Sequence, residues 1–169
     1  MRLYKENTTD AAGKPVWVMS VQINWAYENL ALVNESTHSA LWYFDCNENS
    51  EIINVCWSHA FRRILGYRDI LDFPNELAAW SELLHPEDKD RVLKLLQDTI
   101  ADKTNQTKYK VEYRLKTKGG RYLWFRASAE VIRRLDGSAK RIAGILSNID
   151  AEKRSRMQAQ RAAVFHRAF

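Results

Sequence analysis

The sequence predicts an α+β domain in which helices are grouped against an antiparallel sheet. Two observations carry this prediction. Two strand-like runs within residues 41–57 are followed by helical periodicity over residues 58–100. After Lys103 apolar and polar residues alternate strictly, which is typical of half-buried antiparallel strands. The helices therefore fall between two groups of strands.

A strand and a helix are expected ahead of this domain. Residues 14–23 are rich in β-forming side chains but have no obvious hairpin partner nearby. Residues 25–39 have apolar positions compatible with a helix, and Asn24 can serve as its N-cap. We expect residues 1–24 to be an N-terminal extension, which can be the end of a preceding domain, and residues 25–40 to be a flanking helix.

The first two strands of the domain are expected to form a hairpin. Residues 41–46 and 52–57 are apolar runs separated by a polar loop. A turn in the middle of this loop places Cys46 opposite about Ile52, and not opposite Cys56. We therefore expect two reduced, partly buried thiols and no disulfide.

Three helices are expected next. Ser58 can cap a short helix that ends at Gly66, where a left-handed residue fits. A second helix begins near Asn75 and runs to Leu84. Pro86 suits the first position of a third helix, whose acidic first turn favours the helix dipole. The apolar stripe of this third helix consists of Val92, Leu93, Leu96 and Ile100.

Three strands close the domain as an antiparallel meander. Residues 109–116 and 122–131 alternate strictly, and a tight Gly119-Gly120 turn joins them. Asp136-Gly137 then turns the chain into a third strand over residues 142–146. The inner face of the first two strands is expected to carry Tyr109, Val111, Tyr113, Leu115, Leu123, Phe125, Ala127, Ala129 and Val131.

The outer face of this sheet also needs a cover, because Tyr122 and Trp124 point toward it. Either the helix at residues 25–39 or a partner subunit can provide it. A homodimer is therefore expected, with Trp25, Leu30, Tyr122 and Trp124 as candidate interface residues. Coverage within one chain is the alternative.

The formal net charge of +5 is concentrated at the end of the chain. Residues 151–169 hold five Lys and Arg against one Glu, a net of +4, which leaves 21 basic and 20 acidic side chains in residues 1–150. Because nucleic-acid-binding domains concentrate basic residues on a folded face, nucleic acid is not expected as a partner. A basic helix that docks on nucleic acid or an acidic membrane is the rival interpretation.

Targeting and membrane signals are missing. No apolar run approaches the length of a membrane span, and residues 1–7 lack the apolar stretch of a secretory signal. We expect a cytoplasmic location and no membrane contact by this segment.

Motifs for catalysis or phosphate binding are also missing. The four histidines have no paired-ligand spacing, and neither a P-loop nor a dinucleotide-binding glycine pattern occurs. The sequence therefore favours a binding module over an enzyme. His85 precedes a helix beside the expected core, so a haem sensor or an enzyme using His85 is an alternative. The favoured role of His85 is to close the turn that leads into Pro86.

Five strings occur in an order that resembles the PAS family of sensory domains, in particular its third PAS fold subgroup. They are WSHAFRRILGY (57–67), DFPN (72–75), WSELLHPED (80–88), EYRL (112–115) and GRYLWFR (120–126). Asp136-Gly137 and Gly144 follow in the same order. The second and third strings look most like PAS domains of bacterial methyl-accepting chemotaxis receptors, and related sequences precede diguanylate cyclases and histidine kinases.

The resemblance implies a PAS sensor domain at residues 41–150, with a five-stranded antiparallel sheet around a pocket and no catalysis. The signal then leaves through flanking helices to an output domain in the same parent chain, so residues 151–169 are expected to be a linker helix. The usual exit motif of the family is Asp-Ile-Thr, whereas this chain has Asn148-Ile149-Asp150 as its expected signal relay. The reactive-cysteine string of the light-sensing branch does not occur. No cofactor is assigned, and haem and flavin are disfavoured.

If a small molecule binds, the inner sheet face and the adjoining helices should line its pocket. Candidate pocket residues are Phe44, Phe61, Leu65, Leu93, Tyr113, Phe125 and Ala127. Tyr113 is the candidate polar contact. An ordinary core packed by the same residues is the alternative, in which case the domain is a ligand-free scaffold for dimerisation and protein interaction.

Overall fold

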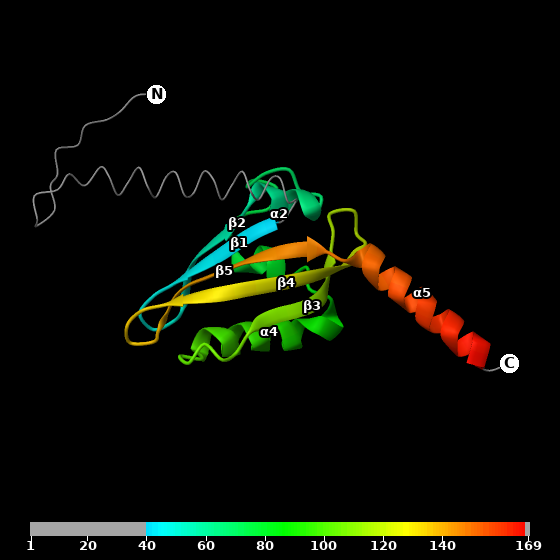
Figure 1. Cartoon of the computed structure of the whole chain (residues 1–169). Helices are drawn as coiled ribbons and strands as arrows, with labels where there is room; N and C mark the ends of the chain where they lie inside the picture. Colours follow the sequence, from blue (N-terminus) through cyan, green and yellow to red (C-terminus); the bar gives the residue numbers. More distant parts are fainter. Residues whose placement is uncertain (1–39, 168–169) are drawn as a thin grey trace, which may run out of the picture. The chain divides into compact units, whose positions relative to one another are not determined.

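The computed structural model describes residues 40–167, which form a five-stranded antiparallel sheet and four helices (Figure 1). The elements in chain order are β1 (Ala40–Cys46), β2 (Ile52–Trp57), α2 (His59–Ile64), α3 (Leu77–Ser81), α4 (Pro86–Ala101), β3 (Tyr109–Lys116), β4 (Tyr122–Arg133), β5 (Ala139–Asn148) and α5 (Asp150–Arg167). The strands lie in the order β2-β1-β5-β4-β3, with every neighbouring pair antiparallel. The predicted α+β class is confirmed. The strand expected at residues 14–23 and the helix expected at 25–39, with Trp25 and Leu30, lie outside the described residues.

The strand register confirms the two faces predicted for the meander. Tyr113 lies opposite Phe125, and Val111 opposite Ala127, all four of them buried on the inner face. Neighbouring positions point to the outer face, where Glu112 lies opposite Arg126. Successive residues of a strand therefore belong to different environments: the core on one side and a polar surface on the other.

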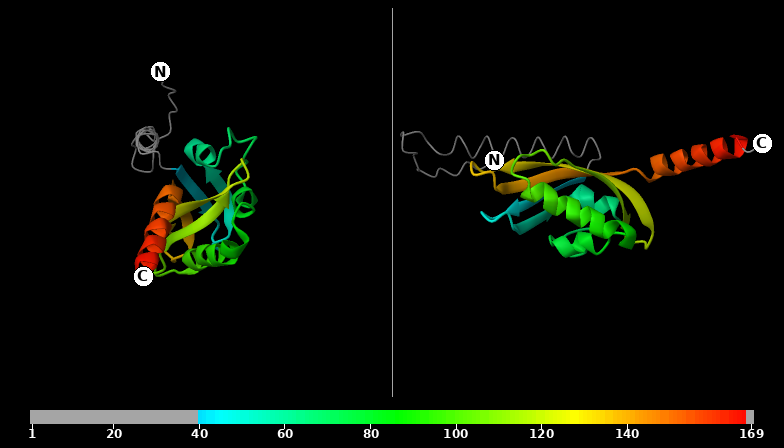
Figure 2. Two further views of the ribbon diagram at one scale, coloured as in Figure 1. Left: turned by 90° about the vertical axis from the view of Figure 1, so that its right-hand side faces the viewer. Right: turned by 90° about the horizontal axis from the view of Figure 1, so that it is seen from below.

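Helices α2, α3 and α4 cover the inner face (Figure 2). The Ser58 hydroxyl caps α2 by accepting the Phe61 N–H, and Gly66 takes the left-handed conformation after the helix with φ of 90°. Both features agree with the sequence prediction. Pro86 stands at the start of α4, as predicted, and His85 is the N-cap of this helix.

Helix α3 is shorter than predicted. It ends at Ser81, whereas the sequence analysis extended it to Leu84. Leu84 instead forms an isolated bridge with Leu115, and the Lys116 N–H donates to the Leu83 carbonyl. Backbone groups of residues 83 and 84 therefore pair with edge strand β3, and the helix does not continue through them.

The β1–β2 hairpin has the predicted register. Cys46 pairs with Ile52, and Cys56 pairs with Tyr43 across the same hairpin. Both cysteines are free thiols, Cys46 buried and Cys56 half-buried. The predicted register and the two free thiols are therefore confirmed, but Cys46 is fully buried and not partly buried as predicted.

Helix α5 follows directly after β5 and extends past the end of the sheet (Figure 1). Lys153 in its first turn is half-buried, whereas every residue from Arg154 to Arg167 is exposed. Most of the stability of a helix in a protein comes from its packing against the rest of the fold, so the attachment of the first turn to the sheet has a large influence on the order of α5.

Candidate functional site

Seven aromatic side chains from the inner sheet face and the helices surround a narrow gap in the core. They are Trp42, Phe44, Trp57, Phe61, Trp80, Tyr109 and Tyr113. The gap has no space for even a water molecule. The rings pack in tilted and edge-on pairs and in one stacked pair, Trp57 on Phe61 with centroids 4.6 Å apart. This geometry is that of a filled aromatic core.

Three of the predicted pocket residues, Phe44, Phe61 and Tyr113, line this gap. Leu65, Phe125 and Ala127 are fully buried in the surrounding core, and Leu93 is partly buried against it. The prediction left out the other four aromatic residues. Tyr109 could have been included, because it shares the inner face of its strand with Tyr113.

The polar atoms of this aromatic cluster contact one another. The side chains of Trp80 and Tyr109 both make polar contacts with the Tyr113 hydroxyl. Burial raises the pKa of both tyrosines above the ordinary value. Their hydroxyls therefore stay neutral at physiological pH and can offer hydrogen bonds but no charge.

His85 lies apart from this gap. Its Nδ1 accepts the Glu87 N–H at 3.1 Å, and its ring meets the Tyr122 ring edge-on at 4.7 Å. The structure thus gives it the helix-capping role that the sequence analysis favoured over haem ligation. Within residues 40–167 no cluster of three or more His, Cys, Asp or Glu side chains could hold a metal ion.

A second candidate site is the junction between the sheet and α5. The Ile149 N–H donates to the Trp124 carbonyl at 2.9 Å, and the Trp124 N–H donates to Asp150 Oδ1 at 3.2 Å. Asn148 Oδ1 accepts the Asp150 N–H at 2.9 Å, and the Ile149 side chain is buried. The three predicted relay residues are therefore held at one point of β4.

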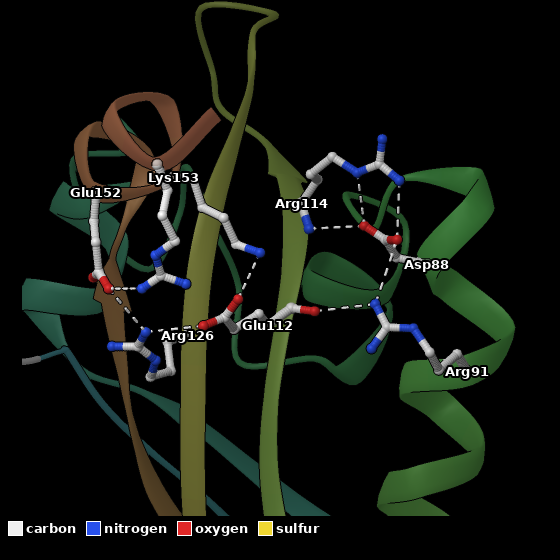
Figure 3. A network of polar contacts seen from close by, with 8 residues as sticks. Asp88, Arg91, Glu112, Arg114, Arg126, Glu152 and Lys153 are labelled. Carbon is white, nitrogen blue, oxygen red and sulfur yellow. Dashed lines mark hydrogen bonds and ion pairs between the residues drawn. The ribbon is translucent and has the colours of Figure 1, made fainter. Parts of the chain in front are cut away.

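Side chains of the outer sheet face strengthen this junction (Figure 3). Glu112 is bound by Lys153 Nζ at 2.7 Å and by Arg126 at 2.9 Å, and Arg126 also reaches Glu152 at 3.4 Å. The hydrogen bonds from Lys153 and Arg126 lower the pKa of Glu112 to about 2. Glu112 thus remains charged at neutral pH and ties α5 to the two strands at the edge of the sheet.

The same network continues to the start of α4. Asp88 accepts bonds from the Arg114 side chain at 2.9 and 3.0 Å and from its backbone N–H at 2.9 Å (Figure 3). Burial alone would raise the pKa of Asp88, but these bonds lower it to about 2. Arg91 approaches Asp88 at 3.4 Å and donates to the Glu112 carbonyl at 3.0 Å. Helices α4 and α5 are therefore joined through β3.

The Trp124 ring lies at the centre of this junction. The Arg114 guanidinium lies 5.0 Å from its centroid and Lys153 Nζ lies 4.4 Å from it, so that two cations contact one indole ring. The sequence analysis named Trp124 as a candidate interface residue because it was expected to face outward. It does face outward, but side chains of its own chain contact its ring. Tyr122 also faces outward and is 40% exposed.

Sequence reasoning missed Glu112, Arg126 and Lys153 as members of this site. Glu112 and Arg126 each follow or precede an inward-facing residue of a correctly assigned strand, so their outward direction was predictable. Their pairing with Lys153 was not, because it depends on the direction in which α5 leaves the sheet.

Comparisons with known proteins agree with this architecture. The sequence model of a family described as the PAS fold matches residues 54–146. No curated protein sequence gives a significant match.

Solved structures of PAS proteins share the fold. A sensory box histidine kinase/response regulator from Burkholderia thailandensis E264 aligns with a TM-score of 0.67 and 24% identity, covering 83% of this chain and 98% of that one. The N-terminal domain of a diguanylate cyclase with PAS/PAC sensor from Marinobacter aquaeolei aligns with a TM-score of 0.55 and 18% identity, covering 68% and 98%. The PAS domain of a protein from Colwellia psychrerythraea gives 0.55 and 18%, covering 75% and 98%.

The sheet order and the helices on its inner face define a PAS-type α+β domain, and the family match covers more than half of the sequence. The chain belongs to the PAS family, whose domains are sensory and not catalytic. Within residues 40–167 no helix combines the length and apolar character that crossing a membrane requires.

Proposed function

We propose that this PAS domain is a signal relay, in which a change within the sheet alters the attachment of α5 and so reaches an output domain. The observation that carries the proposal is the junction at Trp124. Helix α5 is bound there through Ile149, Asp150 and Lys153, while its residues from Arg154 onward are exposed. A helix held mainly at its first turn responds to small changes at that turn.

The strands themselves connect the core to this junction. Tyr113 lies in the aromatic cluster and Glu112, its neighbour in β3, holds Lys153 on the opposite face. Phe125 and Arg126 have the same relation in β4. A shift of either strand that repacks the core must therefore also move the groups that bind α5.

Two inputs are proposed. A small planar ligand can enter the aromatic cluster only if its side chains move, with Phe44, Phe61, Leu65, Leu93, Tyr113, Phe125 and Ala127 as its proposed surroundings. A protein partner or a second copy of the chain is the other input, and the filled gap favours this scaffold function. Exposed Tyr122 and the exposed α5 residues Met157 and Val164 are available for such contacts.

The proposed output domain is a histidine kinase, a diguanylate cyclase or a chemotaxis receptor signalling domain, and the domain is proposed to work in the cytoplasm. Similarity to PAS structures from a histidine kinase and a diguanylate cyclase supports the first two. Native mass spectrometry of the full chain distinguishes the inputs, since a ligand adds mass that denaturation removes and a homodimer doubles the mass.

Hydrogen exchange of the full chain tests the relay itself. Tyr113→Phe removes a core hydroxyl, and we expect it to increase amide exchange over residues 150–157. In a Glu112→Gln background the same change should have a smaller additional effect on α5, because the connection is already weakened. Equal effects of Tyr113→Phe in the two backgrounds would overturn the proposal.

Lys94→Gln is the matched control for these variants. It removes an exposed ion pair with Asp98 on α4, away from the junction. Exchange over residues 150–157 should not change in this variant.

A further inference from the structure

The first turn of α4 is capped by a histidine ring nitrogen. His85 Nδ1 accepts the Glu87 N–H at 3.1 Å, and a ring nitrogen can accept only while it carries no proton. Protonation would remove this bond. It would also place a positive charge at the helix N-terminus, where the helix dipole disfavours a cation.

The surroundings of His85 hold it in this position. Its backbone N–H donates to the Arg114 carbonyl at 3.0 Å, and its ring contacts the Tyr122 ring at 4.7 Å. The charged groups that contact one another at this end of α4 are Glu87 and Asp88 on the helix itself and Arg114 on β3, and Lys116 lies opposite Tyr122 in the strand register. Arg114 is already bound to both carboxylates.

The His85 cap lies next to the network that reaches α5. Asp88, one residue after Glu87, binds Arg114, and Arg114 contacts the Trp124 ring that also contacts Lys153. The pKa values of Asp88 and Glu112 are both about 2, so these carboxylates keep their charge between pH 5 and pH 8. Histidine is the side-chain type that ordinarily changes charge in this interval.

We propose that His85 is a proton-sensitive N-cap, through which acidification loosens the start of α4 and weakens the connection from Asp88 to α5. This goes beyond the relay proposed above, because it assigns a stimulus and an entry point. The loss of the cap is measured on α4 itself and does not require that the signal reach an output domain.

Hydrogen exchange of the full chain at pH 7.5 and pH 5.5, expressed as protection factors, tests this device. In the wild type we expect the protection of the amides in residues 87–91 to fall about fivefold on acidification, the size of a lost N-cap. His85→Asn keeps a capping acceptor that does not titrate, so its protection should be the same at both pH values. His85→Ala has no cap and should show low protection at both.

His59→Gln is the matched control, because it removes an exposed histidine of α2 and should retain the wild-type response. An unchanged wild-type protection factor, or an equal fall in His85→Asn, would overturn the proton-sensitive cap. Residues 150–157 give the second readout, and their protection should fall together with that of α4. A decrease in protection that is confined to α4 would overturn the connection from His85 to α5. The proposed relay would then be tested only by the Glu112→Gln experiment.

Discussion

Gly144 of β5 lies opposite Trp42 of β1, and the indole ring occupies the space that a side chain at position 144 would need. A Cβ built there would lie 2.8 Å from Trp42 Cζ2 and 2.2 Å from the Ser128 carbonyl oxygen. The close approach of two neighbouring strands and an indole ring, rather than an unusual backbone angle, accounts for this glycine. Gly144 thus allows the aromatic cluster to extend over the middle of the sheet.

We therefore expect Gly144→Ala to lower the free energy of unfolding by about 1–3 kcal/mol, the usual cost of overpacking a core. Chemical denaturation monitored by tryptophan fluorescence measures this change. Gly119→Ala is the control, since a Cβ there meets only Thr117 Oγ1 at 3.8 Å, and it should change stability by less than about 0.5 kcal/mol. Equal stability of Gly144→Ala and the wild type would contradict the packing argument.

Glu112 should make stability depend on pH in the acid range. Its pKa is lowered from 4.5 to about 2 in the folded protein by its bonds with Lys153 and Arg126. The folded state therefore prefers the charged form, so this contribution to stability is complete above pH 4.5 and is lost as the pH falls toward 2. Glu112→Gln should be less stable at pH 6 and should lose less stability between pH 4.5 and pH 2.

The pH series needs a comparison with another carboxylate, because Asp88 titrates in the same range in every variant. Glu130→Gln removes an exposed outer-face carboxylate whose ion pair with Lys108 is long, at 3.7 Å. Its pH profile should follow that of the wild type. A Glu112→Gln profile that also follows the wild type would show that the junction does not stabilise the fold.

Local patterns in the sequence were sufficient for most of the fold. Alternation placed Tyr113 and Phe125 on the inner face, and Ser58 and Gly66 marked the limits of α2, because these signals depend only on neighbouring residues. The end of α3 was wrong because the Leu84 bridge to Leu115 is a tertiary pairing. Helix propensity cannot register such competition for backbone groups.

The candidate site was less predictable for a related reason. The inner aromatic positions follow from strand alternation, but only the packed structure shows that their rings fill the gap. At the junction, Lys153 meets Glu112 across 41 residues of sequence, and nothing in the local pattern of either residue indicates this pairing. Long-range ion pairs depend on the geometry of whole elements.

The aromatic cluster should respond to truncation of Phe61, which stacks on Trp57 and is 1% exposed. Phe61→Ala is expected to lower the free energy of unfolding by about 3–5 kcal/mol, as for other buried aromatic residues. The vacated space is lined by aromatic side chains, so benzene or indole should raise the melting temperature of the variant. Phe61→Leu is a milder variant for the case in which the alanine variant does not fold.

The effect of aromatic compounds on the Phe61 variants tests the proposal that a small planar ligand enters the aromatic cluster. Stabilisation of a Phe61 variant by an aromatic compound, with no effect on the wild type, would mean that the core accepts planar molecules once one ring is removed. Leu71→Ala, at a 92% exposed position, should change neither stability nor the response to the compounds. If neither Phe61 variant is stabilised, the scaffold function gains support over ligand binding.

Arg62 should be essential for stability although it makes no contact with the junction. It is buried, and its guanidinium donates to the carbonyls of Phe73 and Trp57 and to Asn75 Oδ1, which also accepts the Trp57 N–H. Arg62→Met would remove this donor from the carbonyls of two buried residues, Phe73 and Trp57, at a cost of about 1–3 kcal/mol for each group, whereas Asn75 Oδ1 would keep the Trp57 N–H. Arg63→Met changes the exposed neighbour on the same helix and should be nearly neutral. Thermal unfolding of both variants measures the difference, and similar melting temperatures would mean that the loop around Asn75 is held by other contacts.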